Sequence, residues 1–153
     1  MNSFQARTSS PEETIKLAEE LGKKLSAGDV ITLAGDLGAG KTHFTKGIAA
    51  ALQVQRTLNS PTFTIMKQYE GTLPLYHMDL YRLGEEEAEE LGLEEYFEGA
   101  GICVIEWSEK LTELLPTQRL HIDIKREGDS SRLLEFCPHG ERFDLLCKEM
   151  QMK

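Results

Sequence analysis

Eight consecutive residues in the first third of the chain have the types and the spacing needed to hold a chain of phosphates. They run from Gly35 to Thr42, read GDLGAGKT, and match the pattern G-x-x-x-x-G-K-[ST] in full. Glycines let successive backbone N–H groups point inward around an anion, and the N-terminus of a following helix adds positive partial charge. In this pattern the lysine, here Lys41, reaches the β- and γ-phosphates, and the hydroxyl of Thr42 can ligate Mg²⁺. The sequence therefore predicts a site for ATP and Mg²⁺, formed by Gly35, Asp36, Leu37, Gly38, Ala39, Gly40, Lys41, Thr42 and His43.

We call Gly35–Thr42 the glycine-rich loop. Its alternative interpretation is a turn that carries an exposed lysine and binds nothing. A strand directly before the loop is indicated by three apolar residues, Val30, Ile31 and Leu33. A helix directly after it is indicated by three apolar residues at helical spacing, Phe44, Ile48 and Leu52. Strand, loop and helix in this order are what phosphate binding requires, so the binding interpretation is favoured.

Two acidic residues each end an apolar strand, which is where open α/β sheets place the chemistry of bound ligands. Glu106 directly follows the apolar run Ile102–Ile105, and Asp79 ends a run that begins at Leu75. Phosphoryl transfer at such a loop needs a carboxylate near Mg²⁺ and a group that orients the attacking water. Either residue could fill either role, and the alternative for each is a solvated acid at a strand end. The catalytic candidates are thus Lys41, Asp79 and Glu106, and the candidate metal ligands are Thr42, Asp79 and Glu106.

Two further segments are candidates for contact with the nucleotide. Ser60-Pro61-Thr62-Phe63 follows the glycine-rich loop at the distance expected of a switch-like loop that senses the γ-phosphate. Thr62 is the hydroxyl we place there, and the alternative is a proline turn that opens a strand. Trp107, the single tryptophan, follows Glu106 directly. By residue type alone it is a core or rim aromatic.

The remaining pattern predicts a mixed α/β sheet, mostly parallel, with helices on both faces. Ser10-Pro11-Glu12-Glu13 has the form of a capping box with proline at the first helical position, and Gly28 is placed to end that helix. A hairpin is expected between strands at Phe63–Tyr69 and Leu73–Leu80. A second hairpin, from Leu120 to Phe136, is expected to extend the sheet antiparallel at an edge.

Three more elements complete the predicted fold. The unbroken apolar run within Gly101–Trp107 is typical of a strand buried on both faces in a parallel sheet. The acidic segment Glu85–Leu91, followed by Gly92, is expected to form a short helix. A final amphipathic helix is indicated by Phe143, Leu146 and Met150. There is no internal repeat or break in composition, so we expect residues 1–153 to form a single domain.

The composition excludes several classes of protein. The 153 residues contain no apolar run near the roughly 20 residues of a membrane helix, and the N-terminus does not resemble a signal peptide. The cysteines, Cys103, Cys137 and Cys147, suggest neither a disulfide framework nor a zinc site, and we expect reduced thiols in the cytoplasm. A net charge of −9 counts against independent binding to nucleic acid. Contact with RNA is therefore expected only through a partner.

Four segments together resemble the TsaE family, also called YjeE, in their order and spacing. They are the glycine-rich loop, Ser60–Phe63, His77-Met78-Asp79-Leu80-Tyr81-Arg82 and Ile105-Glu106-Trp107. The resemblance covers most of the chain and weakens in the C-terminal hairpin and helix. It implies a bacterial, Mg²⁺-dependent ATPase needed to form threonylcarbamoyladenosine at position 37 of certain tRNAs. In that family the ATPase is weak alone and acts with the proteins TsaB and TsaD, of which TsaD transfers the threonylcarbamoyl group.

The resemblance also assigns roles to matching positions. Lys41 and Thr42 would hold the phosphates and Mg²⁺, Asp79 and Glu106 would supply the essential carboxylates, and Trp107 would lie beside the active centre. The implied protein is cytoplasmic, has no contact with a membrane, and meets tRNA only through its complex.

Other classes of nucleotide-binding protein fit the sequence less well. A small-molecule kinase of this loop type usually carries an arginine-bearing lid, yet the arginines of the terminal region are scattered: Arg119, Arg126, Arg132 and Arg142. A GTPase would need an Asn-Lys-x-Asp segment, which the chain lacks. A module that binds nucleotide without hydrolysis stays open. The sequence places no arginine over the γ-phosphate, and Arg82, close after Asp79, is the least unsuitable candidate. We therefore expect slow turnover until a partner completes the site or stabilises the closed switch loop.

Overall fold

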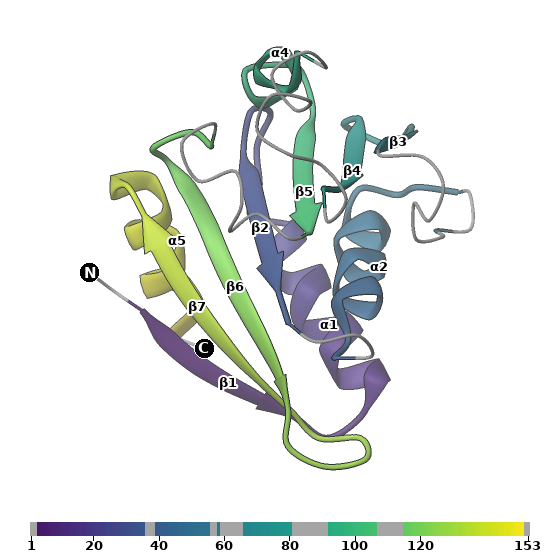
Figure 1. Cartoon of the computed structure of the whole chain (residues 1–153), viewed down its shortest axis with the longest axis vertical. Coiled ribbons are helices and arrows are strands. Elements are labelled where there is room, and N and C mark those ends of the chain that lie inside the picture. Colours follow the sequence, from purple (N-terminus) through teal and green to yellow (C-terminus); the bar gives the residue numbers. More distant parts are fainter. Residues whose placement is uncertain are drawn as a thin grey trace.

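The computed structural model describes residues 3–35, 39–55, 58, 66–80, 92–106 and 115–151. Over these residues seven strands form one sheet (Figure 1). The strands are β1 (Phe4–Thr8), β2 (Val30–Ala34), β3 (Met66–Tyr69), β4 (Leu75–Asp79), β5 (Ile102–Glu106), β6 (Arg119–Arg126) and β7 (Arg132–His139). The helices in the same residues are α1 (Pro11–Gly22), α2 (Lys41–Ala51), α4 (Leu93–Phe97) and α5 (Glu141–Gln151).

The centre of the sheet is parallel and its two sides are antiparallel. The strand order is β1-β7-β6-β2-β5-β4-β3. Strand β2 is parallel to both of its neighbours, β5 and β6, and β4 is parallel to β5. The other three pairings, β3 with β4, β6 with β7 and β7 with β1, are antiparallel. The sheet is thus mixed, as expected, but it is partly and not mostly parallel, because the two hairpins and the added strand β1 each contribute an antiparallel pair.

Both expected hairpins are present, and one is placed differently from the prediction. The described part of the first hairpin pairs Met66–Tyr69 with Leu75–Met78. The second, β6 with β7, is antiparallel as expected but does not reach the edge of the sheet. Strand β1, which the sequence did not indicate, pairs along β7, and the rings of Phe4 and Phe136 stack with centroids 4.5 Å apart.

The helices begin as their capping residues predict, but α1 ends earlier than expected. The Ser10 hydroxyl accepts a hydrogen bond from the Glu13 N–H at 3.1 Å, and the Glu13 carboxylate accepts one from the Ser9 N–H at 2.9 Å. Helix α1 then ends at Gly22, six residues before Gly28, because the chain tightens into turns at residues 23–25. Helix α4 follows Gly92 and was not expected. The helix expected at Glu85–Leu91 lies outside the described residues.

Successive side chains along the central strands point to opposite faces of the sheet, so the core consists of two clusters. Ile31, Leu33 and Val104 pack in one cluster with α1, α2 and α5, and Cys103 and Ile105 pack in the other with α4. Helices therefore cover both faces of the sheet, although unequally; Figure 1 shows α1 and α5 behind the sheet. Strand β5 is buried along its length, as its unbroken apolar run predicts. None of the described helices is both long and apolar enough to cross a lipid bilayer.

Helices α1 and α2 approach each other through glycines. A Cβ on Gly47 would lie 2.2 Å from the Ile15 carbonyl oxygen and 2.5 Å from the Ala18 Cβ. A Cβ on Gly22 would lie 2.6 Å from the Ala51 Cβ. The missing side chains allow α2 to lie close against α1, and this fixes the helix that the glycine-rich loop enters.

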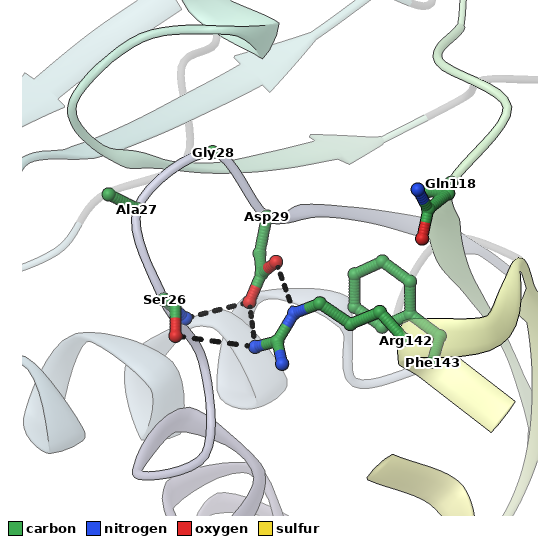
Figure 2. A pocket seen from close by; sticks show the side chains of 7 residues that line it. All are labelled: Ser26, Ala27, Gly28, Asp29, Gln118, Arg142 and Phe143. Carbon is green, nitrogen blue, oxygen red and sulfur yellow. Dashed lines mark hydrogen bonds and ion pairs between the residues drawn. The ribbon is translucent and has the colours of Figure 1, made fainter. Parts of the chain in front are cut away.

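At the opposite end of β2 from that loop, an ion pair fastens α5 to the turn before the strand (Figure 2). Nε and Nη2 of Arg142 donate to the two carboxylate oxygens of Asp29 at 2.8 and 2.6 Å, and the Ser26 N–H donates to the same carboxylate at 2.7 Å. Around this pair is a polar recess of about 390 Å³, lined by Ser26, Ala27, Gly28, Asp29, Gln118, Arg142 and Phe143.

Candidate functional site

The glycine-rich loop lies between β2 and α2, and its described glycines disfavour a side chain for different reasons, Gly35 for lack of space and Gly40 because of its backbone conformation. A Cβ on Gly35 would lie 2.5 Å from the Ile124 carbonyl oxygen. Gly40 caps α2 with φ +114°, a backbone conformation that residues with a side chain rarely adopt. The expected strand and helix are thus present on either side of the loop. The N-terminus of α2, which follows Gly40 directly, is a kind of helix end that can bind a phosphate group.

Lys41, the first residue of α2, is folded back across the loop. Its side chain is buried, with 7% of the residue exposed, and Nζ donates a 2.8 Å hydrogen bond to the Gly35 carbonyl. A buried ammonium group requires such partners. Thr42 follows it in the first turn of α2 and is half-buried. The cation that the sequence assigns to phosphate binding therefore joins the first residue of α2 to Gly35, which follows β2.

Asp79 and Glu106 lie side by side where two parallel strands of the sheet end. They are in register at the carboxyl ends of the adjacent parallel strands β4 and β5, and Glu106 is also in register with Leu33 of β2, two residues before Gly35. Both side chains belong to the face of the sheet that packs against α2, because they alternate in step with Leu75 and Val104 of that core cluster. The structure therefore brings both predicted carboxylates to the same end of the parallel strands at which β2 leads into the glycine-rich loop.

Glu106 has a partner that the sequence did not reveal. The residue is only 4% exposed, and its Oε2 forms a 3.0 Å hydrogen bond with Nε2 of His77, which is fully buried. Among the described residues, Nδ1 of the same ring has no hydrogen-bond partner. Sequence spacing placed His77 on the strand face of Asp79 and gave no reason to connect it to a residue 29 positions away.

Arg132 also reaches the loop, although sequence reasoning dismissed it as one of several scattered arginines. Its Nε donates to the Ala39 carbonyl at 2.7 Å, and its Nη1 donates to the carbonyls of Gly128 and Ser131 at 3.2 and 3.0 Å. With His43 and Gly40 it lines a small recess at the start of α2. The connection spans 93 residues of sequence, and no local pattern could have indicated it.

Several predicted site residues lie outside the described residues, and their roles stay predictions. They are Asp36, Leu37, Gly38, Thr62, Arg82 and Trp107. Within the part of the chain that the structure describes, no three His, Cys, Asp or Glu side chains gather as a metal cage. Mg²⁺ in nucleotide sites is held by one or two carboxylates together with substrate phosphates. The pair formed by Asp79 and Glu106, with the Thr42 hydroxyl, fits that requirement.

Comparison with known proteins gives concordant matches. Residues 8–134 match the family described as "Threonylcarbamoyl adenosine biosynthesis protein TsaE". The tRNA threonylcarbamoyladenosine biosynthesis protein TsaE of Bacillus subtilis is 52% identical, over 98% of this chain and 95% of that protein. The protein of the same name from Treponema pallidum is 41% identical, over 80% of this chain and 92% of its own length. The crystal structure of Bacillus subtilis YdiB superposes with a TM-score of 0.86 at 47% identity, covering 98% of this chain and 95% of that one.

The family match includes the glycine-rich loop, both carboxylates and most of the sheet, and the match to the Bacillus subtilis protein covers 98% of the chain. The sequence resemblance is thus confirmed over nearly the whole chain. The chain belongs to the TsaE family of tRNA threonylcarbamoyladenosine biosynthesis proteins.

Proposed function

We propose that this protein is a Mg²⁺-dependent ATPase that serves threonylcarbamoyladenosine formation at position 37 of tRNA, in the cytoplasm, together with TsaB and TsaD. In this proposal residues 1–153 act as one ATPase domain. The observation that supports it most strongly is the register of Asp79 with Glu106 at the edge where β2 leads into the glycine-rich loop. Hydrolysis of a nucleoside triphosphate requires two such carboxylates beside a phosphate-binding loop.

Each side chain of the site has a defined task in this proposal. The glycine-rich loop and the N-terminus of α2 bind the phosphates, and Lys41 exchanges its bond to the Gly35 carbonyl for one to phosphate oxygens. Thr42 and one of the two carboxylates hold Mg²⁺, which when bound neutralises charge on the phosphates. The other carboxylate orients the attacking water, and the division of these roles between Asp79 and Glu106 stays open.

The proposal includes slow hydrolysis by the isolated protein. Arg132 is the described arginine that reaches the glycine-rich loop, and its Nε and Nη1 are bonded to backbone carbonyls. A cation over the γ-phosphate accelerates this reaction by several orders of magnitude. The proposal therefore assigns completion of the site to the TsaB–TsaD pair. The net charge of −9 supports an indirect contact with tRNA.

The test is release of phosphate from MgATP by the full chain, alone and with TsaB–TsaD. We expect the partners to raise the rate. Lys41→Ala should abolish nucleotide binding in calorimetry, because the loop loses the ammonium group at its centre. Glu106→Ala should bind ATP and lose at least about 100-fold in turnover, the size expected for a group that acts on the reacting water. Lys46→Ala, on the exposed side of the same helix, is the matched control and should behave as the parent.

Three results would count against the proposal. Absence of binding heat for MgATP in the folded parent, with partners present, would reject the nucleotide site. A loss of ATP affinity in Glu106→Ala equal to that in Lys41→Ala would contradict the role assigned to Glu106. Transfer of phosphate to a small molecule, without free phosphate, would favour the small-molecule kinase.

A further inference from the structure

A buried imidazole lies directly behind the carboxylate of Glu106. His77 is fully buried on β4, two residues before Asp79 and on the same face of the sheet. It is in register with Val104, two residues before Glu106 on β5, so its ring reaches Glu106 from the core side. The distance from Nε2 to Oε2 is 3.0 Å. The bond therefore joins the two strands that carry both candidate carboxylates.

The chemistry of the pair fixes which atom donates. A carboxylate oxygen accepts hydrogen bonds and an imidazole N–H donates them, so in this pair the hydrogen lies on Nε2 of His77. The other ring nitrogen, Nδ1, has no partner among the described residues. Burying an unsatisfied polar atom costs free energy, and an apolar side chain of similar size would pack without that cost. The feature that distinguishes histidine at this position is its bond to Glu106.

We propose that His77 is a positioning residue for Glu106 in ATP hydrolysis. Its Nε2–H fixes Oε2 on the core side and so turns the second oxygen, Oε1, toward the edge of the sheet where phosphate, Mg²⁺ and water meet. Partners that hold a ligating carboxylate in place typically influence metal affinity or activity by about 10- to 100-fold. This inference rests on the proposed function and assigns to it a residue beyond the two carboxylates.

The matched variants are His77→Gln and His77→Asn. Both are amides, but the glutamine nitrogen reaches about as far as Nε2, whereas the asparagine nitrogen ends near the position of Nδ1. In the complex with TsaB–TsaD we expect His77→Asn to lower kcat by about 10- to 100-fold with an unchanged Kd for ATP. His77→Gln should recover most of kcat. A purely structural role would lower the melting temperature of both variants without this separation.

NMR supplies a readout that does not depend on turnover. Correlation spectra of nitrogen-labelled protein distinguish protonated from bare ring nitrogens. We expect His77 to hold its hydrogen on Nε2 in the parent and to lose that preference in Glu106→Ala. If the asparagine variant does not fold, the spectra of the parent and Glu106→Ala alone test the proposal. A hydrogen on Nδ1 in the parent would overturn it.

The failures of the two proposals can be told apart. A parent that releases no phosphate with its partners present overturns the proposed function. A parent that hydrolyses ATP, with a folded His77→Asn variant of equal kcat, overturns only the role of His77.

Discussion

The guanidinium group of Arg132, at the start of β7, donates a 2.7 Å hydrogen bond to the backbone carbonyl of Ala39 in the glycine-rich loop. The same side chain holds the carbonyls of Gly128 and Ser131, so the loop and the β6–β7 turn share one anchor. A carbonyl held in this way cannot rotate, so the peptide that joins Ala39 to Gly40 keeps its orientation.

Arg132→Ala should therefore weaken binding of MgATP while leaving the fold intact. A hydrogen bond of this kind contributes about 0.5–1.5 kcal/mol, which corresponds to a two- to tenfold increase in Kd. Calorimetric titration measures it directly. Arg126→Ala is the control on the same hairpin, because the side chain of Arg126 is exposed and bonds to the Gly128 carbonyl of its own turn. Equal affinities in the parent and Arg132→Ala would contradict the anchoring role.

Gly47→Ala should destabilise the protein, because α1 has no room for the new methyl group. The nearest contacts include the Ile15 carbonyl oxygen at 2.2 Å and the Glu19 backbone nitrogen at 3.0 Å, neither of which can rotate away. Overpacking of this kind costs about 1–3 kcal/mol. Urea unfolding followed by circular dichroism measures the change, and Lys46→Ala, one residue away and exposed, should leave the midpoint unchanged. A Gly47→Ala variant as stable as the parent would show that α1 and α2 separate easily.

Removal of Arg142 should leave a buried carboxylate without its main partner. The Asp29 side chain is 7% exposed and would keep only its bond from the Ser26 N–H. Hydrogen bonds to charged groups contribute about 1.5–3 kcal/mol, so Arg142→Ala should lower the free energy of unfolding by about that amount. The control is Arg7→Ala, because the pair of Arg7 and Glu127 is 67% and 36% exposed and should contribute less than about 1 kcal/mol. Similar urea midpoints for the two variants would argue against a stabilising role of the ion pair between Arg142 and Asp29.

The buried thiols predict a loss of stability in alkaline solution. Burial raises the pKa of Cys103 from 9.0 to about 12 and that of Cys147 to about 11. Above pH 9 the unfolded chain releases protons that the folded chain retains, so the free energy of unfolding falls as the pH rises toward these values. Between pH 8 and 10 the fall should be about 1 kcal/mol per thiol.

The measurement is the urea midpoint of the parent and of a Cys103→Ala/Cys147→Ala double variant across that range of pH. The double variant should lose the part of the slope that belongs to the thiols. Parallel curves for the two proteins would show that other groups cause the alkaline change.

The sequence could predict the features that are formed by residues close together in the chain. The glycine-rich loop is contiguous, and strand β5 is an unbroken apolar run, so both could be identified without knowledge of neighbours. Asp79 and Glu106 could each be selected because each ends an apolar strand, whereas their register is known only from the structure. The capping of α1 by Ser10 was likewise a local pattern.

The features that the sequence did not predict depend on distant contacts. Phe4 is held by its ring contact with Phe136, and nothing near Phe4 in the sequence indicates that strand. The bond from Arg132 to Ala39 joins two segments that only the finished sheet brings together. In the sequence His77 has only the features of a strand residue, because its bond to Glu106 depends on the neighbouring strand β5. The helix α4 is only five residues long, too short for periodicity to show.

The position of β2 has a consequence for biosynthesis. This strand ends at Ala34, but its two neighbours in the sheet begin at Ile102 and Arg119. On the ribosome, roughly two thirds of the chain must therefore emerge before β2 has a strand to bond, and pairing over such separations is slow. Until then its apolar side chains are open to chaperones or to aggregation. The centre of the sheet is therefore completed only when β5 and β6, which lie late in the chain, have been translated.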